Sequence, residues 1–430
     1  MVSHTFRVRL VFGLVMSAVA LAPWGAAWAQ TLNGGMNELE DAYRKRRILA
    51  GQLLKGTTAF DAGDKTHDEA LDLEARYMTY RVYLDRLEVR EEKANRPTIE
   101  RAFRDFEGDL NYLEKGKPGT QAASDVFRDK LRLHALEVIQ FEKAKPIHKL
   151  FNARILAEVG KLGQAQLADT LVEVLADKTQ TDGVRFYALR GLRTLLALPG
   201  PMPMQPLLNK AQETKCAEAL LDFLEKKQGP SKGAPKDEID GFRVLRREAI
   251  RALAQLHSPA LGEKARPALV LARFAGADER IQPAPRLDER VEAAIGLARM
   301  QSAQDKQYQP DYAANQIGRC LGAFGQAFSD EKANRKEGVD SIRPWKIDAY
   351  HFNEALNALK ADSGKDAYVA GVIDRGARIL ADVKRGDQPK ADDVTWFSTP
   401  DSDPPNKELF KGMADSVVKP AKPAEPSADK

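Results

Sequence analysis

A short residue pattern that recurs three times in the middle of the chain constrains its fold more than any other feature. In each copy an arginine is followed three residues later by alanine, after three more by glycine or alanine, and then at once by leucine. Residues at this spacing lie on one face of a helix, and their small side chains let a neighbouring helix approach closely. Recurrence at intervals of roughly 30–60 residues predicts a stack of helical repeats. The copies are Arg185, Ala188, Gly191 and Leu192; Arg246, Ala249, Ala252 and Leu253; and Arg290, Ala293, Gly296 and Leu297.

Residues 1–29 have the pattern of a cleavable export signal. Two arginines precede an almost wholly apolar run over residues 10–21, and small residues follow at the positions that a signal peptidase reads. An uncleaved membrane anchor is the alternative, but the apolar run is short for a span and Pro23 interrupts it. We therefore expect cleavage between Ala29 and Gln30, an extracytoplasmic (periplasmic or secreted) protein, and no transmembrane segment in the mature chain.

The charge balance argues against a nucleic-acid partner. The whole chain has 66 basic and 62 acidic residues, a formal net charge of +4, and loss of Arg7 and Arg9 with the signal would leave +2. A nucleic-acid-binding protein would show a large basic excess or a basic face. Charged residues make up 30% of the chain and are interleaved with regular apolar positions, which is typical of soluble amphipathic helices.

Helical periodicity divides the rest of the chain into three parts. Residues 30–123 form an N-terminal helical segment, residues 124–385 hold the repeats, and residues 386–430 form an irregular arm and a disordered tail. In the arm, Trp396 and Phe397 are expected to dock on the last helices, whereas the Pro-, Lys- and Ala-rich tail from Lys419 cannot bury enough surface to fold. Helices are expected over residues 36–54, 66–93, 97–114, 124–145, 151–160, 168–176, 312–328, 348–360 and 368–384.

Two local signals refine these boundaries. Thr66 and Glu69 have the spacing of a capping box, which would start the helix over residues 66–93. Residues 198–206 contain four prolines and are expected to run extended, and residues 228–241 are rich in Lys, Gly and Pro and read as an exposed loop.

The repeat region resembles the HEAT-repeat (HEAT/armadillo-like) α-solenoid family. The segment Asp182-Gly183-Val184-Arg185, followed by Ala188 and Leu192, matches the turn aspartate and the Val-Arg that open the second helix of a family unit. In the other two units the aspartate is shifted: Asp240 lies six residues before its arginine, and Asp288 lies two before. The resemblance covers roughly residues 126–300. It implies an all-α solenoid whose curved surface binds protein, as a scaffold or adaptor without a cofactor.

The residues that commonly carry chemistry do not form a catalytic or metal-binding motif. The histidines after the signal are widely spaced, and there is neither a His-Glu-x-x-His pattern nor a Gly-x-Ser-x-Gly elbow. We therefore predict no catalytic, cofactor-binding or metal-binding residue. Cys216 and Cys320 are expected to be small buried residues on repeat helices, and an alternative in an exported protein is a disulfide between them.

Three hypotheses for function follow. The first is an exported, non-catalytic scaffold or adaptor that binds a protein partner. Arg190, Arg193 and Arg251 would point away from the core and be available to solvent or a partner, and they are not assigned to a site. The second is an all-α, α/α-toroid-like enzyme that processes envelope polysaccharide, for which Trp345 would have to lie in a cleft beside clustered acids. The third is an envelope structural protein. The basic run over residues 44–47 reads as the solvated side of a helix, or alternatively as a contact with an anionic envelope surface.

Overall fold

The regular structure of this chain is helical. The computed structural model describes residues 32–83, 102–104, 106–108, 110, 120–199, 206–226, 229–231, 233–262, 264–335, 341 and 343–420. Within these ranges there are helices and isolated β-bridges, such as Tyr308 with Phe410, but no strand. The predicted all-α class is therefore confirmed. The expected export signal lies outside the described residues, and no helix within them combines the length and apolar content needed to cross a membrane.

The helices agree with the periodicity of the repeat region. Those predicted over residues 168–176, 312–328, 348–360 and 368–384 are present and extend a few residues further. The α-helices are α2 (Leu32–Lys55), α3 (Lys65–Tyr80), α6 (Gln121–Gln140), α7 (Pro146–Gly160), α8 (Leu167–Ala176), α9 (Asp182–Ala197), α10 (Lys210–Lys226), α11 (Lys236–Leu253), α12 (Pro267–Ala275), α13 (Leu287–Ala298), α14 (Pro310–Asn334), α15 (Trp345–Ser363), α16 (Ala367–Arg385) and α17 (Ala391–Trp396).

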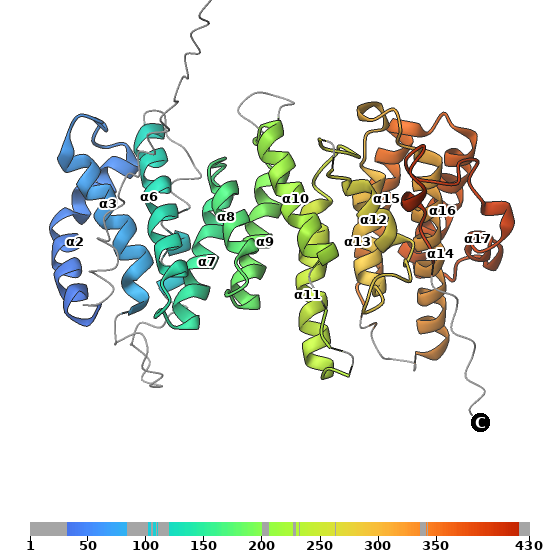
Figure 1. Cartoon of the computed structure of the whole chain (residues 1–430), viewed down its shortest axis with the longest axis horizontal. Coiled ribbons are helices and arrows are strands. Elements are labelled where there is room, and N and C mark those ends of the chain that lie inside the picture. The colour runs from blue at the N-terminus through green and yellow to red at the C-terminus, as the bar shows by residue number, and fades with distance from the viewer. Residues whose placement is uncertain are drawn as a thin grey trace, which may run out of the picture.

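The helices follow one another along the long axis of the molecule, from α2 at one end to α16 and α17 at the other (Figure 1). From α6 onward they lie in two rows. Helices α7, α9, α11, α13 and α15 each contact the next in one row, and α6, α8, α10, α12 and α14 do so in the other. Consecutive helices also contact each other across the rows, as α8 with α9 and α12 with α13 do. The side chains between the rows form the hydrophobic core.

The small residues of the recurring pattern lie where neighbouring helices of the first row approach most closely. A Cβ atom added at Gly191 on α9 would lie 3.4 Å from the Cα atom of Ala157 on α7. At Gly296 on α13 it would lie 2.8 Å from the Cα atom of Ala254, just after α11. The distance at Gly296 leaves no room for a methyl group, so the close approach that the sequence predicts is confirmed there. At Gly191 the distance to Ala157 is an ordinary van der Waals contact, and the atom that an added Cβ would meet, at 2.7 Å, is Cδ1 of Leu171 on α8.

Two of the recurring arginines cap the C-terminal end of the preceding helix by hydrogen bonding. The Arg185 guanidinium donates a hydrogen bond of 3.0 Å to the carbonyl oxygen of Asp177, which follows α8. Arg290 donates one of 3.1 Å to the carbonyl oxygen of Ala275, the last residue of α12. The last carbonyl groups of a helix have no partner within it, so an arginine on the second helix of each pair satisfies one of them.

Several of the expected boundaries are wrong. The helix expected over residues 124–145 is α6, which ends at Gln140. Asp64, not Thr66, is the N-cap of α3, because the Asp64 carboxylate accepts hydrogen bonds from both the Thr66 amide and the Thr66 hydroxyl. That helix ends at Tyr80 and passes into a 3₁₀ turn (Arg81–Tyr83), and residues 84–93 of the expected helix lie outside the described residues. Helix α11 begins at Lys236, within the expected loop, where acidic side chains in its first turn favour a helix N-terminus.

The C-terminal arm packs on α14. Phe397 is buried and lies against Gly318 and Gly322, whose missing side chains make room for its ring. The Val418 amide donates a hydrogen bond of 2.7 Å to the hydroxyl oxygen of Tyr312. Lys419 was expected to begin a disordered tail, but its carbonyl oxygen accepts a hydrogen bond of 2.8 Å from the Glu279 amide. The remaining tail residues, 421–430, lie outside the described residues.

We predict that Gly296→Ala destabilises the protein, whereas Gly371→Ala does not. The new methyl group at Gly296 meets the backbone of Ala254, and forcing such a contact costs about 1–3 kcal/mol. The same change at Gly371 on α16 meets no atom within 4 Å and gains up to about 1 kcal/mol of helix propensity. Urea unfolding of both variants measures the difference, and equal free energies of unfolding would contradict the close-approach argument.

Candidate partner-binding surface

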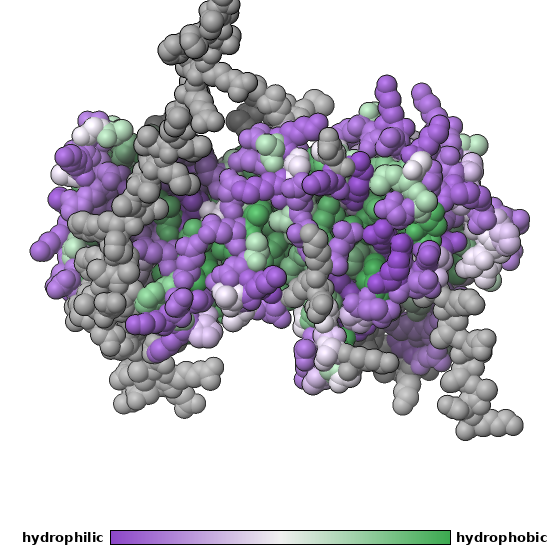
Figure 2. Space-filling view, in the orientation of Figure 1, coloured by the Kyte–Doolittle hydropathy of each residue, from purple (hydrophilic) through white to green (hydrophobic). Residues whose placement is uncertain are grey.

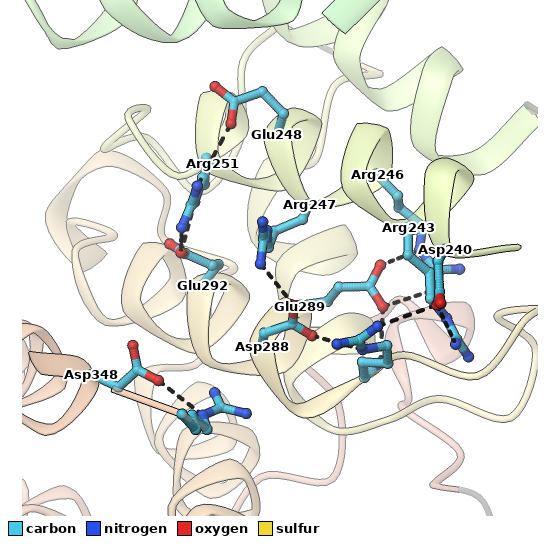
Figure 3. Close-up of polar contacts among 12 residues, drawn as sticks. Asp240, Arg243, Arg246, Arg247, Glu248, Arg251, Asp288, Glu289, Glu292 and Asp348 are labelled. Carbon is cyan, nitrogen blue, oxygen red and sulfur yellow. Dashed lines mark hydrogen bonds and ion pairs between the residues drawn. The ribbon is translucent and has the colours of Figure 1, made fainter. Parts of the chain in front are cut away.

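Arginines of the first row reach carboxylates on the neighbouring helix and form a series of ion pairs across four helices, the charge ladder. Arg190 on α9 lies 3.5 Å from Glu158 on α7, and Arg193 lies 3.1 Å from Glu248 on α11. From α11, Arg247 donates a hydrogen bond of 2.8 Å to Asp288, and Arg251 donates one of 2.7 Å to Glu292, both on α13 (Figure 3). The ladder therefore joins α7, α9, α11 and α13 side by side.

Arg190, Arg193 and Arg251 point away from the core as predicted, but they are not free. Their side chains are 38%, 32% and 34% exposed, so each guanidinium remains accessible to solvent. The prediction that they are simply available to a partner needs correction, because each is paired with a carboxylate of an adjacent helix. Sequence periodicity places a side chain on its own helix and contains no information on what the next helix presents to it.

Below the ladder, Arg246 and Glu289 form a buried ion pair between α11 and α13. Their side chains are 2% and 1% exposed, and two hydrogen bonds of 2.6 and 2.8 Å join the guanidinium to the two carboxylate oxygens. Arg246 also donates to the carbonyl oxygen of Pro283 at 2.8 Å, and Glu289 accepts a 2.8 Å hydrogen bond from the Arg286 amide at the start of α13. A two-point pair of this kind fixes the relative orientation of its helices.

The environment of the ladder keeps its central arginine charged. Arg251 is partly buried, which disfavours its charged form. The hydrogen bond to Glu292 and the nearby carboxylates of Glu248 and Asp288 outweigh this, so the pKa of Arg251 is raised. Its contacts with Glu248 and Glu292 lie on either side of one side chain (Figure 3). The side chains of Glu158 and Glu248 are only 5% exposed, whereas those of Asp288 and Glu292 are 25% and 24% exposed. The arginines therefore supply most of the fixed charge that the ladder can present to another molecule.

A second polar cluster joins α3 to α6. The His134 ring lies between the carboxylates of Asp72, at 2.9 Å from Nε2, and Glu137, at 3.3 Å from Nδ1. The Tyr80 hydroxyl donates a hydrogen bond of 2.7 Å to Glu137, and Arg76 lies 2.9 Å from Asp72. Burial disfavours the charged ring, but the hydrogen bonds to the two carboxylates outweigh it and raise the pKa of His134. Among the described residues, no group of His, Cys, Asp or Glu has the arrangement of a metal site.

The two cysteines are buried and free, which excludes the alternative of a disulfide between them. Cys216 lies on α10 and Cys320 on α14. Burial raises the pKa of the Cys216 thiol to about 12 and that of Cys320 to about 11. Thiols of this kind stay protonated and behave as small apolar side chains, as the sequence predicted.

The tryptophans that the enzyme hypothesis needs are engaged in packing. Trp345 is buried, its ring lies edge-on to Phe324 and Phe328, and its Nε1 donates a hydrogen bond of 2.8 Å to Glu331. Trp396 is half-buried, and the guanidinium of Arg375 lies 4.5 Å from its ring centroid. Neither ring is placed as an open platform for a sugar.

No protein-family model, curated protein or solved structure matches this chain.

We predict that Arg246→Met destabilises the protein far more than Arg190→Met. The first change leaves the Glu289 carboxylate buried without its partner, which costs about 3–5 kcal/mol. When Arg190, which is 38% exposed, is removed, Glu158 keeps its ion pair with Lys161, so the loss should be about 0–1 kcal/mol. The double variant Arg246→Met/Glu289→Gln should recover part of the loss, because it removes the unpaired charge and keeps an acceptor for the Arg286 amide. Chemical denaturation tests this, and equal losses for the two single variants would refute it.

We predict that the contribution of His134 to stability is lost as pH rises. Its pKa is raised in the folded protein, so the contribution is complete below the unfolded value of about 6.5 and disappears as pH passes the folded value. The free-energy difference between the wild type and His134→Gln should therefore shrink as pH rises above about 6.5 and passes the raised folded pKa of His134. His257→Gln is the matched control. Burial and Arg299 lower the pKa of His257, so its pH dependence should have the opposite sign. A difference independent of pH for His134 would contradict the prediction.

Proposed function

We propose that the protein is an exported, HEAT-like α-solenoid that acts as a non-catalytic scaffold or adaptor and binds a protein partner through the charge ladder of α7, α9, α11 and α13. The observation that carries the proposal is the ladder itself. Its arginines are about one-third exposed, and their positions are fixed by ion pairs that continue over four neighbouring helices. Fixed charges on an extended surface favour selection of a partner with the complementary pattern.

The energetics support an external role for these charges. The Arg247–Asp288 and Arg251–Glu292 pairs are partly exposed on both sides and contribute about 0–1 kcal/mol each to folding, so stability alone is a weak reason for them. The buried pair Arg246–Glu289 already fixes α11 against α13. Stacked helix pairs bury a continuous core while they leave one face of a row open, which suits recognition of a long partner surface. In Figure 2, hydrophilic side chains cover much of the visible face, with apolar groups between them.

The polysaccharide-processing enzyme is the second candidate, and two observations weigh against it. Trp345 is buried in side-chain packing and does not line a cleft. The helices at the two ends of the series, α2 and α17, lie at opposite ends of the molecule (Figure 1), whereas a toroid brings its ends together. A purely structural role in the envelope remains the third candidate, and it differs from the first in requiring no single stoichiometric partner.

We predict that crosslinked capture of the tagged protein from an envelope fraction recovers one partner in near-equal amounts. The double charge swap Arg251→Glu/Glu292→Arg keeps the intramolecular pair but reverses the pattern that a partner meets, so recovery should fall about tenfold or more. Swapping Lys215 and Asp169, an exposed pair that joins α10 to α8 in the other row, should leave recovery unchanged.

Either of two results would contradict the proposal. If no protein is captured reproducibly, the proposed binding of a protein partner is contradicted. Equal recovery with both charge swaps would show that the partner binds elsewhere than on the ladder. Thermal unfolding of each variant controls for loss of structure.

A further inference from the structure

A cleft of about 540 Å³ is lined by residues of α2, α3 and the connection between them. These two helices lie at the end of the molecule away from α16 and α17 (Figure 1). The lining of the cleft follows α2 from Tyr43 to Lys55 and includes Glu74 and Met78 on α3. A helix rises 1.5 Å per residue, so the α2 side of the cleft is about 18 Å long. The volume falls within the range of about 300–1,000 Å³ that is usual for small-molecule sites, and the cleft is elongated.

The middle of the cleft is apolar and unfilled. Met78 and Tyr43 lie buried along it, and Leu54 is half-buried. Ile48 is 74% exposed, the largest value among the exposed large apolar side chains of the described residues. At Gly51, between Ile48 and Leu54, an added Cβ atom would meet nothing within 4 Å. At Gly191 and Gly296, by contrast, a neighbouring helix fills the equivalent space.

An arginine at the edge of this cleft has no partner among the residues that the structure describes. In the basic run of α2, Arg44 is paired with Glu40 at 2.9 Å and Arg46 with Glu69 at 3.1 Å. Arg47, which lines the cleft, makes no hydrogen bond or ion pair with any residue that the structure describes. The carboxylate of Glu74 is 7% exposed and accepts a hydrogen bond of 3.4 Å from the Tyr43 hydroxyl. The accessible charge at the rim is therefore positive.

We propose that this cleft binds a single anionic amphiphile, with its alkyl chain along Ile48, Gly51 and Leu54 and its anionic head group at Arg47. An elongated apolar trough with a cation at its edge matches a molecule that has one apolar chain and one negative end. A carboxylate suits the guanidinium, whose planar fork hydrogen-bonds both carboxylate oxygens. The cleft and the charge ladder are on different helices. The proposed ligand site and the proposed scaffold role are therefore independent, and either one can be disproved without the other.

Titration calorimetry with decanoate, below its micellar concentration, tests the proposal on the whole protein. We expect saturable one-to-one binding. Decyltrimethylammonium, which has the same chain length and the opposite charge, should bind about tenfold more weakly or worse. Gly51→Leu fills the trough and Arg47→Glu reverses its charge, so each should weaken decanoate binding at least about tenfold. Gly371→Leu, a glycine on α16 with equally open surroundings, should leave it unchanged.

Several outcomes would overturn the proposal. They are the absence of saturable decanoate binding, equal binding of the cationic amphiphile, and undiminished binding by Gly51→Leu. Sedimentation with phosphatidylglycerol vesicles in the absence of monomer binding would also overturn it and assign the basic run to a membrane surface instead. Leucine is a better helix former than glycine, so Gly51→Leu should fold, and circular dichroism checks that it does.

Discussion

The close approach of neighbouring helices in the first row is the constraint on which the rest of the structure depends. Gly191 and Gly296 allow α9 and α13 to lie against the backbones of α7 and of the residue after α11. At that separation, side chains on adjacent helices reach each other, so arginines and carboxylates form direct ion pairs with no solvent between them. The buried pair Arg246–Glu289 and the exposed ladder above it are therefore consequences of packing as much as of charge.

The repeat helices were predictable because their cause is local. Periodic apolar positions and the small-residue pattern specify a helix and the face that it buries, and Cys216 and Cys320 were correctly expected to be buried. The N-cap of α3 was missed, although Asp64 is as good a capping residue as Thr66, because both side chains fit and only the structure shows which one accepts. Competition between neighbouring capping residues of this kind decides the position of a helix boundary within two or three residues.

The candidate site was less predictable, because it is made between helices. The sequence placed Arg190, Arg193 and Arg251 off the core face, but their partners lie 32 to 55 residues away along the chain. Arg246 belonged to the recurring pattern and gave no sign of a different role from Arg185 and Arg290. Those two arginines close helix ends, whereas Arg246 has a carboxylate in reach, since Glu289 sits in the first turn of α13.

The C-terminal arm has a consequence for how the chain is made. Its last described residues return to the connection after α12, where Arg280 donates a hydrogen bond to the carbonyl oxygen of Val417 across 137 positions. During synthesis the N-terminal helices emerge first and can pack as they appear. The glycine-lined side of α14 stays uncovered until the arm has left the ribosome, so this end of the molecule can be completed only after the arm, more than 60 residues beyond α14, has been synthesised.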